Sequence, residues 1–147
     1  MPDSEITLQD VYKARDRIAS VALRTPLVPS PLLAQQAGAS VHLKLENLQH
    51  TGAFKLRGAT NKMLSLTDEE KARGVLTVSS GNHGRAVAYV AGRLGIPAVI
   101  CMSLRVPGNK VEAIRNLGAK VVLRGDSYEE AEIHAHHLLE QRGMCLV

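Results

Sequence analysis

The segment Val75-Leu76-Thr77-Val78-Ser79-Ser80-Gly81-Asn82-His83-Gly84 decides the fold of this chain. It begins with apolar and β-branched residues, which are typical of a buried strand, and it ends where an amphipathic stretch starts. Three further strand candidates follow at residues 98–102, 120–123 and 144–147. Counted from Val75, Ala98, Lys120 and Gly143, the spacings are 23, 22 and 23 residues, which leaves room for a helix between each pair.

Helices are predicted in all three gaps, from about Asn82 to Leu94, from about Pro107 to Gly118, and from about Ser127 to Arg142. Apolar strands that alternate with amphipathic helices predict an α/β fold, with a parallel sheet of right-handed βαβ units and flanking helices. Sheets of this kind carry their functional sites at the carboxyl ends of the strands. The loops that follow the strands therefore receive the closest attention.

The amino-terminal third shows a different pattern. A helix is predicted over residues 7–21, with Thr7 as its N-cap and Asp10 in the capping-box position. Three prolines between residues 26 and 31 exclude a continuing helix. A short helix is then predicted over residues 32–36, and the alternation of apolar and polar residues predicts a strand over residues 41–46.

The composition excludes several classes of protein. With 147 residues, 45% hydrophobic and 22% charged, the chain has the size and balance of one globular domain and not of a disordered or fibrous protein. Aromatic residues make up only 3% and offer little stacking surface for single-stranded nucleic acid. The net charge of +4 arises wholly after residue 50 and is interspersed with acids. It indicates mild attraction for anionic small molecules, with no nucleic-acid partner.

The expected compartment is the cytoplasm. Cys101 and Cys145 lie in apolar runs and are expected to be reduced, buried thiols, because two cysteines make no disulfide framework. No apolar segment reaches the 18 or so residues of a membrane span, so no membrane association is expected. The first five residues also lack the basic and apolar parts of a signal peptide.

The first candidate site surrounds Lys55, in the stretch that runs from Glu46 to Ala59. Lys55 opens a predicted helix, where the positive end of the helix dipole repels an ammonium group. Repulsion and burial are both expected to favour the neutral amine that a nucleophilic or Schiff-base lysine requires. Phe54 beside it could pack on a flat cofactor. From these residues alone, a surface lysine that happens to begin a helix is an equally good interpretation.

The second candidate site joins the strand at 75–79 to the following helix and comprises Ser79, Ser80, Gly81, Asn82 and His83. Free backbone N–H groups gather at a helix N-terminus, and glycine lets an anion approach closely. Hydroxyl, amide and imidazole groups add hydrogen-bond partners. The pattern indicates a site for phosphate or carboxylate, and the alternative is a plain turn with a serine cap.

Three other functions find little support. A nucleotide-binding Rossmann domain is disfavoured, because no Gly-x-Gly-x-x-Gly pattern follows the strand. A metal site is not expected, because His134, His136 and His137 share one predicted helix with no partnered carboxylate. A thiol nucleophile lacks a nearby histidine.

Taken together, these stretches closely resemble the fold-type II pyridoxal-phosphate enzymes, in the branch of the threonine/serine dehydratases (ammonia-lyases) and serine racemase. The resemblance rests on Thr25-Pro26-Leu27, on residues 44–49 (KLENLQ), on residues 51–59 (TGAFKLRGA) and on residues 79–84 (SSGNHG). Ala53 stands where many family members have serine, which is a mild departure. The resemblance implies a tryptophan-synthase-β-like fold and the cofactor pyridoxal 5'-phosphate.

The resemblance also implies roles for single residues. Lys55 would form the Schiff base with the cofactor, Phe54 would pack beside the pyridine ring, and Asn82 would hydrogen-bond the phenolic oxygen. The substrate carboxylate would be received by the residues of the strand–helix turn: Ser79, Ser80, Gly81, Asn82 and His83. Ser80 would face Cα opposite the lysine, and Lys55 and Ser80 are therefore the expected catalytic residues.

The activity implied is that of a carbon–nitrogen lyase, which turns a β-hydroxy amino acid such as threonine or serine into a keto acid and ammonia. An amino-acid racemase and a hydroxyectoine-utilisation dehydratase of the same family are alternatives. So is a catalytically incomplete α/β module that only binds anions. A homodimer is expected for the full-length protein, from the resemblance alone.

The length of the chain limits this expectation. In the family, the glycine-rich loop for the cofactor phosphate and the partner of the pyridine nitrogen lie further along than Val147. Residues 1–53 are expected to be the opening of the large cofactor domain, and residues 54–147 most of the small domain, with about four parallel strands. The 147 residues alone are expected to be inactive.

Overall fold

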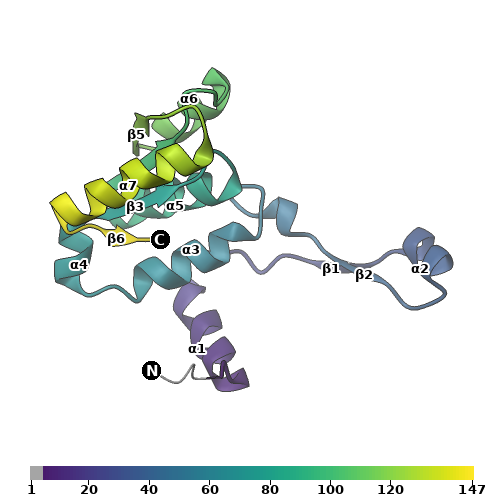
Figure 1. Cartoon of the computed structure of the whole chain (residues 1–147). Coiled ribbons are helices and arrows are strands. Elements are labelled where there is room, and N and C mark those ends of the chain that lie inside the picture. Colours follow the sequence, from purple (N-terminus) through teal and green to yellow (C-terminus); the bar gives the residue numbers. More distant parts are fainter. Residues whose placement is uncertain (1–4) are drawn as a thin grey trace.

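A four-stranded parallel sheet lies at the centre of the computed structural model, which describes residues 5–147 (Figure 1). Its strands are β3 (Val75–Val78), β4 (Ala98–Met102), β5 (Lys120–Leu123) and β6 (Cys145–Leu146), in the order β5-β4-β3-β6. Every neighbouring pair is parallel, and Val75 pairs with both Ala98 and Cys145. The predicted α/β fold is confirmed, and β4 and β5 have the bounds that the sequence predicted.

Helices cover both faces of this sheet. Alternate residues of a strand point to opposite faces, so the strands contribute side chains to two separate cores. Val75, Ile100 and Met102 lie in the main core with residues of α5 (Asn82–Leu94) and α6 (Gly108–Arg115). Leu76, Val99 and Cys101 form a second core with Ala135 of α7 (Tyr128–Arg142). The three predicted helices are thus confirmed, with α6 ending three residues before Gly118.

The helix that begins at Lys55 belongs to the main core. This helix, α3 (Lys55–Leu64), buries Leu56, Ala59 and Met63 along one face and packs closely against α5. A further short helix, α4 (Asp68–Arg73), follows. The sequence analysis did not predict α4, although Thr67 and Glu70 cap it with the reciprocal bonds of a capping box.

The amino-terminal part begins with α1 (Leu8–Ile18), which packs on α3. The predicted capping box is confirmed, because the Thr7 side chain accepts from the Asp10 N–H and the Asp10 side chain accepts from the Thr7 N–H. The Arg17 guanidinium donates to the Asn61 side chain of α3. Residues 1–4, on which the expectation of a missing signal peptide partly rests, lie outside the described residues.

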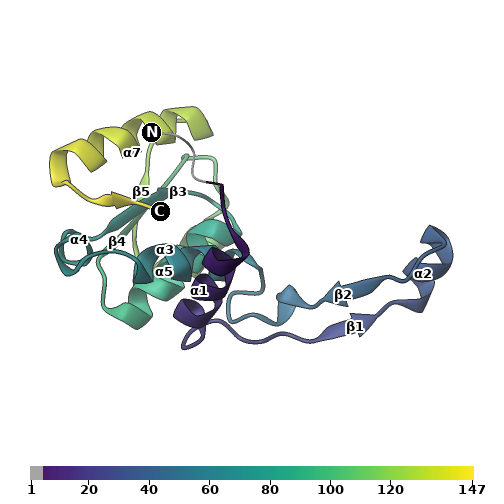
Figure 2. The ribbon, with the colours of Figure 1, turned by 90° about the horizontal axis from the view of Figure 1, so that it is seen from below.

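An extended arm projects from this body (Figures 1 and 2). It consists of β1 (Leu27–Pro29), α2 (Pro31–Ala37), β2 (His42–Lys44) and the single turn η1 (Glu46–Leu48). β1 pairs antiparallel with β2 in a sheet of its own. The predicted strand over 41–46 is therefore shorter, and β1 was missed because its flanking prolines indicated only a break.

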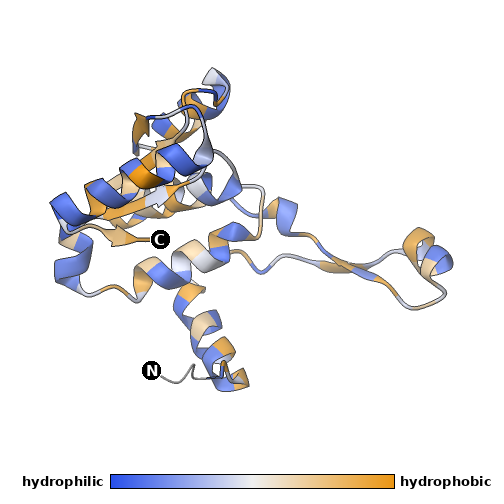
Figure 3. Cartoon of the chain, viewed as in Figure 1, coloured by the Kyte–Doolittle hydropathy of each residue, from blue (hydrophilic) through white to orange (hydrophobic). Residues whose placement is uncertain are grey.

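Hydrophobic residues recur along the arm (Figure 3), and several of their side chains are exposed. Leu27, Leu32 and Leu43 are 62%, 66% and 40% exposed. The first half of α1 is similar, with Leu8 and Val11 exposed, whereas Ile18 and Val21 further on are buried. The predicted boundary at residue 53 stays a prediction, since α1 packs on α3 and only the arm stands apart from the central sheet.

One ion pair fastens the base of the arm to α3. The Arg57 guanidinium donates from Nε and Nη2 to the two oxygens of Glu46, over 2.9 Å and 2.6 Å. The hydrogen bond from Arg57 lowers the pKa of the Glu46 carboxyl to about 2. The carboxylate side chain is only 17% exposed, so little solvent competes for it.

Both cysteines are free thiols. Cys101 is buried, whereas Cys145, which was expected to be buried, is partly exposed in the short edge strand β6. Among residues 5–147, no helix combines the length and the apolar character that a bilayer crossing requires.

Replacing Gly84 by alanine is predicted to destabilise the fold by about 1–3 kcal/mol, because overpacking in a core costs that much. A Cβ at Gly84 would lie 2.5 Å from the carbonyl oxygen of Ser79 and 3.3 Å from Ile100 and Ile114. The matched control is Gly58→Ala in α3, where a Cβ meets nothing within 4 Å. The control should gain about 0.5–1 kcal/mol from helix propensity. Urea unfolding compares the two, and equal effects would contradict the packing argument.

The Glu46–Arg57 pair should make stability fall at acid pH. Its contribution is fully present above the ordinary pKa of 4.5 and is lost as the pH falls towards the folded value of about 2. The difference in unfolding free energy between the native protein and Glu46→Gln should therefore be constant above about pH 5.5 and shrink below pH 4.5. A difference that does not change between pH 7 and pH 2 would contradict the pairing.

Candidate active site

The carboxyl end of β3 leads directly into the N-terminus of α5, where the sequence predicts an anion site. Gly81 is the N-cap and supplies no side-chain acceptor to the N–H groups of the first turn. Ser79 shapes the turn: its N–H donates to the Cys101 carbonyl, and its hydroxyl accepts from the Gly81 N–H over 3.2 Å. Ser80, Gly81 and Asn82 are exposed. The first-turn N–H groups are therefore available to an anion.

The two glycines of this turn have different roles. Gly81 is open, since a Cβ there would meet nothing within 4 Å. Gly84 is buried and lets α5 approach the Ser79 carbonyl. The expectation that both glycines admit an anion therefore applies to Gly81 alone, because Gly84 is used for packing.

A cavity of about 280 Å³ opens in front of this turn. It is lined by Ser80, Gly81 and Asn82, and by Arg85, Asn109, Lys110 and Ala113. Two helix N-termini, those of α5 and α6, thus meet at one cavity together with two cationic side chains. Positive dipole ends and cations both favour a bound anion.

The sequence analysis missed the three polar residues Arg85, Asn109 and Lys110. A signal was available for Lys110, because it lies in the first turn of a helix at the carboxyl edge of the sheet, as unfavourably placed as Lys55. Arg85 carried no signal, since a cation one turn into a helix is common on surfaces.

Ser80 also borders a second, small cavity of about 40 Å³, lined further by Ser103, Cys101 and Tyr128. Burial raises the pKa of the Cys101 thiol to about 11, so it stays protonated at neutral pH. A protonated thiol is a poor nucleophile, in agreement with the sequence analysis.

Lys55 is the first residue of α3, as predicted, but its side chain is exposed. The expected burial of the Lys55 amine is therefore not observed among the described residues, because none of their elements covers the start of α3. Phe54 is 61% exposed, and the Lys55 Nζ lies 5.4 Å from the centroid of its ring. An amine and an aromatic face are thus presented side by side.

Packing connects the two helices that carry the predicted sites. α3 packs along α5, and the loop before Lys55 rests on α5 through His50, whose ring stacks on Tyr89 at 5.4 Å. His83 is turned elsewhere: its Nε2 lies 2.9 Å from the Val147 carbonyl oxygen, and it does not line the 280 Å³ cavity. The structure therefore groups Ser80, Gly81 and Asn82 in one cavity and leaves His83 beside it.

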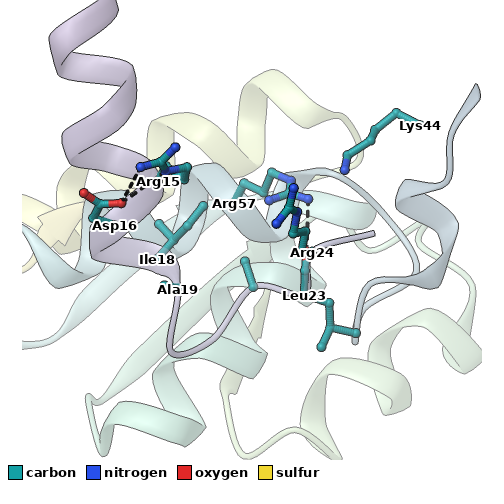
Figure 4. Close-up of a pocket in the computed structure, with 9 residues that line it drawn as sticks. Arg15, Asp16, Ile18, Ala19, Leu23, Arg24, Lys44 and Arg57 are labelled. Carbon is teal, nitrogen blue, oxygen red and sulfur yellow. Dashed lines mark hydrogen bonds and ion pairs between the residues drawn. The ribbon is translucent and has the colours of Figure 1, made fainter. Parts of the chain in front are cut away.

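A further cavity lies away from this turn, between α1 and the base of the arm (Figure 4). It measures about 540 Å³, and its lining includes Arg15, Arg24, Lys44 and Arg57.

Among the described residues, no cluster of histidine, cysteine and carboxylate side chains could hold a metal. His137 instead approaches the Gln141 amide on the same helix, which is typical of a polar surface.

Comparison with known proteins agrees with this geometry. Residues 18–147 match the sequence profile described as pyridoxal-phosphate dependent enzyme. The L-threonine ammonia-lyase of Thermotoga maritima is 44% identical over 142 residues, which are 97% of this chain and 35% of that protein.

Two solved structures superpose closely. The serine racemase of Dictyostelium discoideum has a TM-score of 0.90 at 35% identity, over 98% of this chain and 47% of that one. The processed form of threonine deaminase isoform 2 of Solanum lycopersicum has a TM-score of 0.84 at 35% identity, over 97% and 43%.

The chain spans less than half the length of these relatives. Nearly all of it is nevertheless matched, and the match includes the lysine that opens α3, the turn at the N-terminus of α5 and all four strands of the parallel sheet. The chain therefore belongs to the family of pyridoxal-phosphate dependent enzymes.

Proposed function

We propose that the protein carrying this chain is a pyridoxal-phosphate dependent dehydratase (ammonia-lyase) that converts a β-hydroxy amino acid, such as threonine or serine, into a keto acid and ammonia. The observation that carries the proposal is the pairing of an exposed lysine at the start of α3 with an anion-binding cavity at the start of α5. The names of the relatives, threonine ammonia-lyase, threonine deaminase and serine racemase, support the same chemistry.

The residues present fit one side of the cofactor. Pyridoxal phosphate supplies an aldehyde that condenses with amines and a ring that accepts the electron pair left when an α-proton is removed. Lys55 is the amine proposed to hold it, and the exposed face of Phe54 is the flat surface proposed to lie beside its ring. Asn82, exposed at the first position of α5, is proposed to hydrogen-bond its phenolic oxygen.

The substrate carboxylate is proposed to bind at the N-terminus of α5. Ser79, Ser80, Gly81, Asn82 and His83 supply the backbone and side-chain donors proposed from the sequence. Arg85 and Lys110 add positive charge at the same cavity. Charge-assisted hydrogen bonds of this kind are short and directional. They would fix the α-carbon of the amino acid at a defined distance from Lys55.

Lys55 is proposed to act as the general base that would take the α-proton of the bound amino acid. An amine is a suitable general base when it is positioned and neutral. Loss of the β-hydroxyl as water, followed by addition of water, then yields the keto acid and ammonia. No oxidant or reductant is required, because the elimination is redox-neutral.

A racemase is the second candidate, and Ser80 favours it. Its side chain is exposed and borders both the 280 Å³ and the 40 Å³ cavities. A hydroxyl that returns a proton to Cα from the side opposite Lys55 would invert the amino acid without eliminating water. Chiral analysis of the recovered amino acid, alongside keto-acid release, separates racemisation from elimination.

The residues that hold the cofactor phosphate and the pyridine nitrogen are proposed to lie outside residues 1–147. Residues 1–53 are proposed to open the large cofactor domain, and residues 54–147 to form most of the small one. The full protein is proposed to be a cytoplasmic homodimer, with a small amino acid as its substrate and no nucleic-acid or membrane partner.

Lys55→Ala is predicted to abolish both the visible absorbance of bound cofactor and keto-acid production, because no other amine occupies the start of α3. The control is Lys62→Ala, which removes an exposed lysine from the last turn of the same helix and should keep both properties. Turnover that survives Lys55→Ala would rule the assignment out. Absence of both signals in the native protein would favour the anion-binding module.

Lys110→Met is predicted to raise the KM for the amino acid by about two- to tenfold, with a smaller effect on kcat, because an exposed charge contributes modestly to binding. Lys120→Met is the matched control. Lys120 is the first residue of β5, so it lies at the amino end of a strand, whereas the cavity lies at the carboxyl ends. Steady-state kinetics at several salt concentrations measure the difference. An equal change in both variants would contradict the carboxylate site.

A further inference from the structure

The start of α3 lacks the usual support of a helix N-terminus. Its N-cap, Phe54, is already in the right-handed helical conformation, and no side chain accepts a hydrogen bond from the first turn. Besides the bonds within the helix itself, two backbone bonds hold this turn: from the Leu56 N–H to the Ala53 carbonyl, at 3.5 Å, and from the Arg57 N–H to the Phe54 carbonyl, at 3.0 Å. Something other than a cap must therefore fix where Lys55 lies.

Arg57 provides a long-range contact in this first turn. Besides its two bonds to Glu46, its Nη2 donates to the Leu23 carbonyl over 3.1 Å. Glu46 and Leu23 precede it by 11 and 34 residues. The first turn of α3 is thus tied to two separate stretches of chain. A bidentate guanidinium–carboxylate pair fixes orientation as well as distance.

The acceptor side of this contact is itself held rigidly. The Thr25 hydroxyl donates to Glu46 over 2.6 Å, and the Gln49 amide donates to the other Glu46 oxygen over 3.4 Å. The Gln49 side chain also makes hydrogen bonds to both backbone groups of Leu23: it accepts from the N–H at 3.0 Å and donates to the carbonyl at 2.8 Å. Thr25 and Gln49 are only 5% and 4% exposed. The carboxylate therefore has little freedom to follow a displaced arginine.

We propose that Glu46 and Arg57 form a positioning pair that sets the location of Lys55 for the reaction, and this inference rests on the proposed function. Residues two apart on a helix lie about 200° apart around its axis, so Arg57 points away from Lys55. The pair acts through the backbone of the first turn and touches neither the cofactor nor the substrate.

An alternative role for Arg57 is binding an anion in the 540 Å³ cavity, which it lines together with Arg24 and Lys44 (Figure 4). The structure favours positioning, because Nε and Nη2 of Arg57 already donate to Glu46 and Leu23. An anion-binding role would predict a change in KM, whereas a positioning role predicts a change in kcat.

The test uses the complete protein loaded with pyridoxal phosphate, in three forms: Arg57→Met, Glu46→Gln and the double variant. Arg57→Met leaves a carboxylate unpaired, so it should lower the thermal midpoint. The double variant removes that carboxylate and should recover much of the midpoint. If Arg57→Met fails to fold, Arg57→Lys replaces it, since lysine keeps the charge without the bidentate geometry.

Each form is compared by kcat, by KM, by the pH dependence of the cofactor absorbance, and by deuterium exchange at residues 55–58. Arg17→Ala is the matched control, because it also removes a long-range bond to α3, to Asn61 in its second half. The control should match the native protein in kcat and in absorbance.

The expected result is a fall in kcat of about 10²-fold for Arg57→Met, with KM within about threefold, because small displacements of a reacting group cost that much. The double variant should keep this loss even where its midpoint recovers. Recovery of kcat together with the midpoint would overturn the proposal and leave a purely structural role. A native protein without a cofactor adduct at Lys55 would instead overturn the proposed function, and the positioning role with it.

Discussion

The packing of α3 against α5 is the constraint on which the site depends. The two helices share one apolar core, to which Leu56, Ala59 and Met63 contribute from α3 and Val87 and Val90 from α5. α5 in turn lies close to the sheet, because Gly84 lets it approach the end of β3. The amine at the start of α3 and the candidate anion site at the start of α5 are therefore carried by two helices of the same core.

The arm and the first half of α1 present the opposite situation. Their apolar side chains are exposed, and their polar anchor is the network around Glu46 and Arg57. Exposed apolar patches of this kind often mark interaction sites, and the relatives are more than twice as long as this chain. Phe54 and Lys55 are exposed as well, since no described element covers them.

Most of the central body was predictable from the sequence, because its signals are local. Apolar strands at a regular spacing, Gly95 after α5 and the serine cap of α7 all act within a few residues. Three features were not predictable in the same way. The β1–β2 pair depends on a contact across the arm, the exposure of Lys55 depends on what packs over it, and the Arg85–Lys110 cavity depends on two helices meeting.

Lys55, Ser80 and Asn82 could be singled out as candidates from the sequence. The charge of Lys55 is unfavourable at a helix N-terminus, and Ser80 and Asn82 add polar groups that a plain helix start does not require. Arg57 was not singled out, since an arginine in the first turn of a helix looks like any surface cation until its carboxylate partner is known. Long-range polar pairing leaves no periodic trace in the sequence, and it is visible only once the chain is folded.

The most direct test of the central claim is borohydride reduction of the complete protein with pyridoxal phosphate, followed by peptide mass mapping. The account predicts one reduced pyridoxyl adduct, located on Lys55. An adduct confined to another lysine, or an unmodified Lys55 in a protein that turns over a β-hydroxy amino acid, would contradict it.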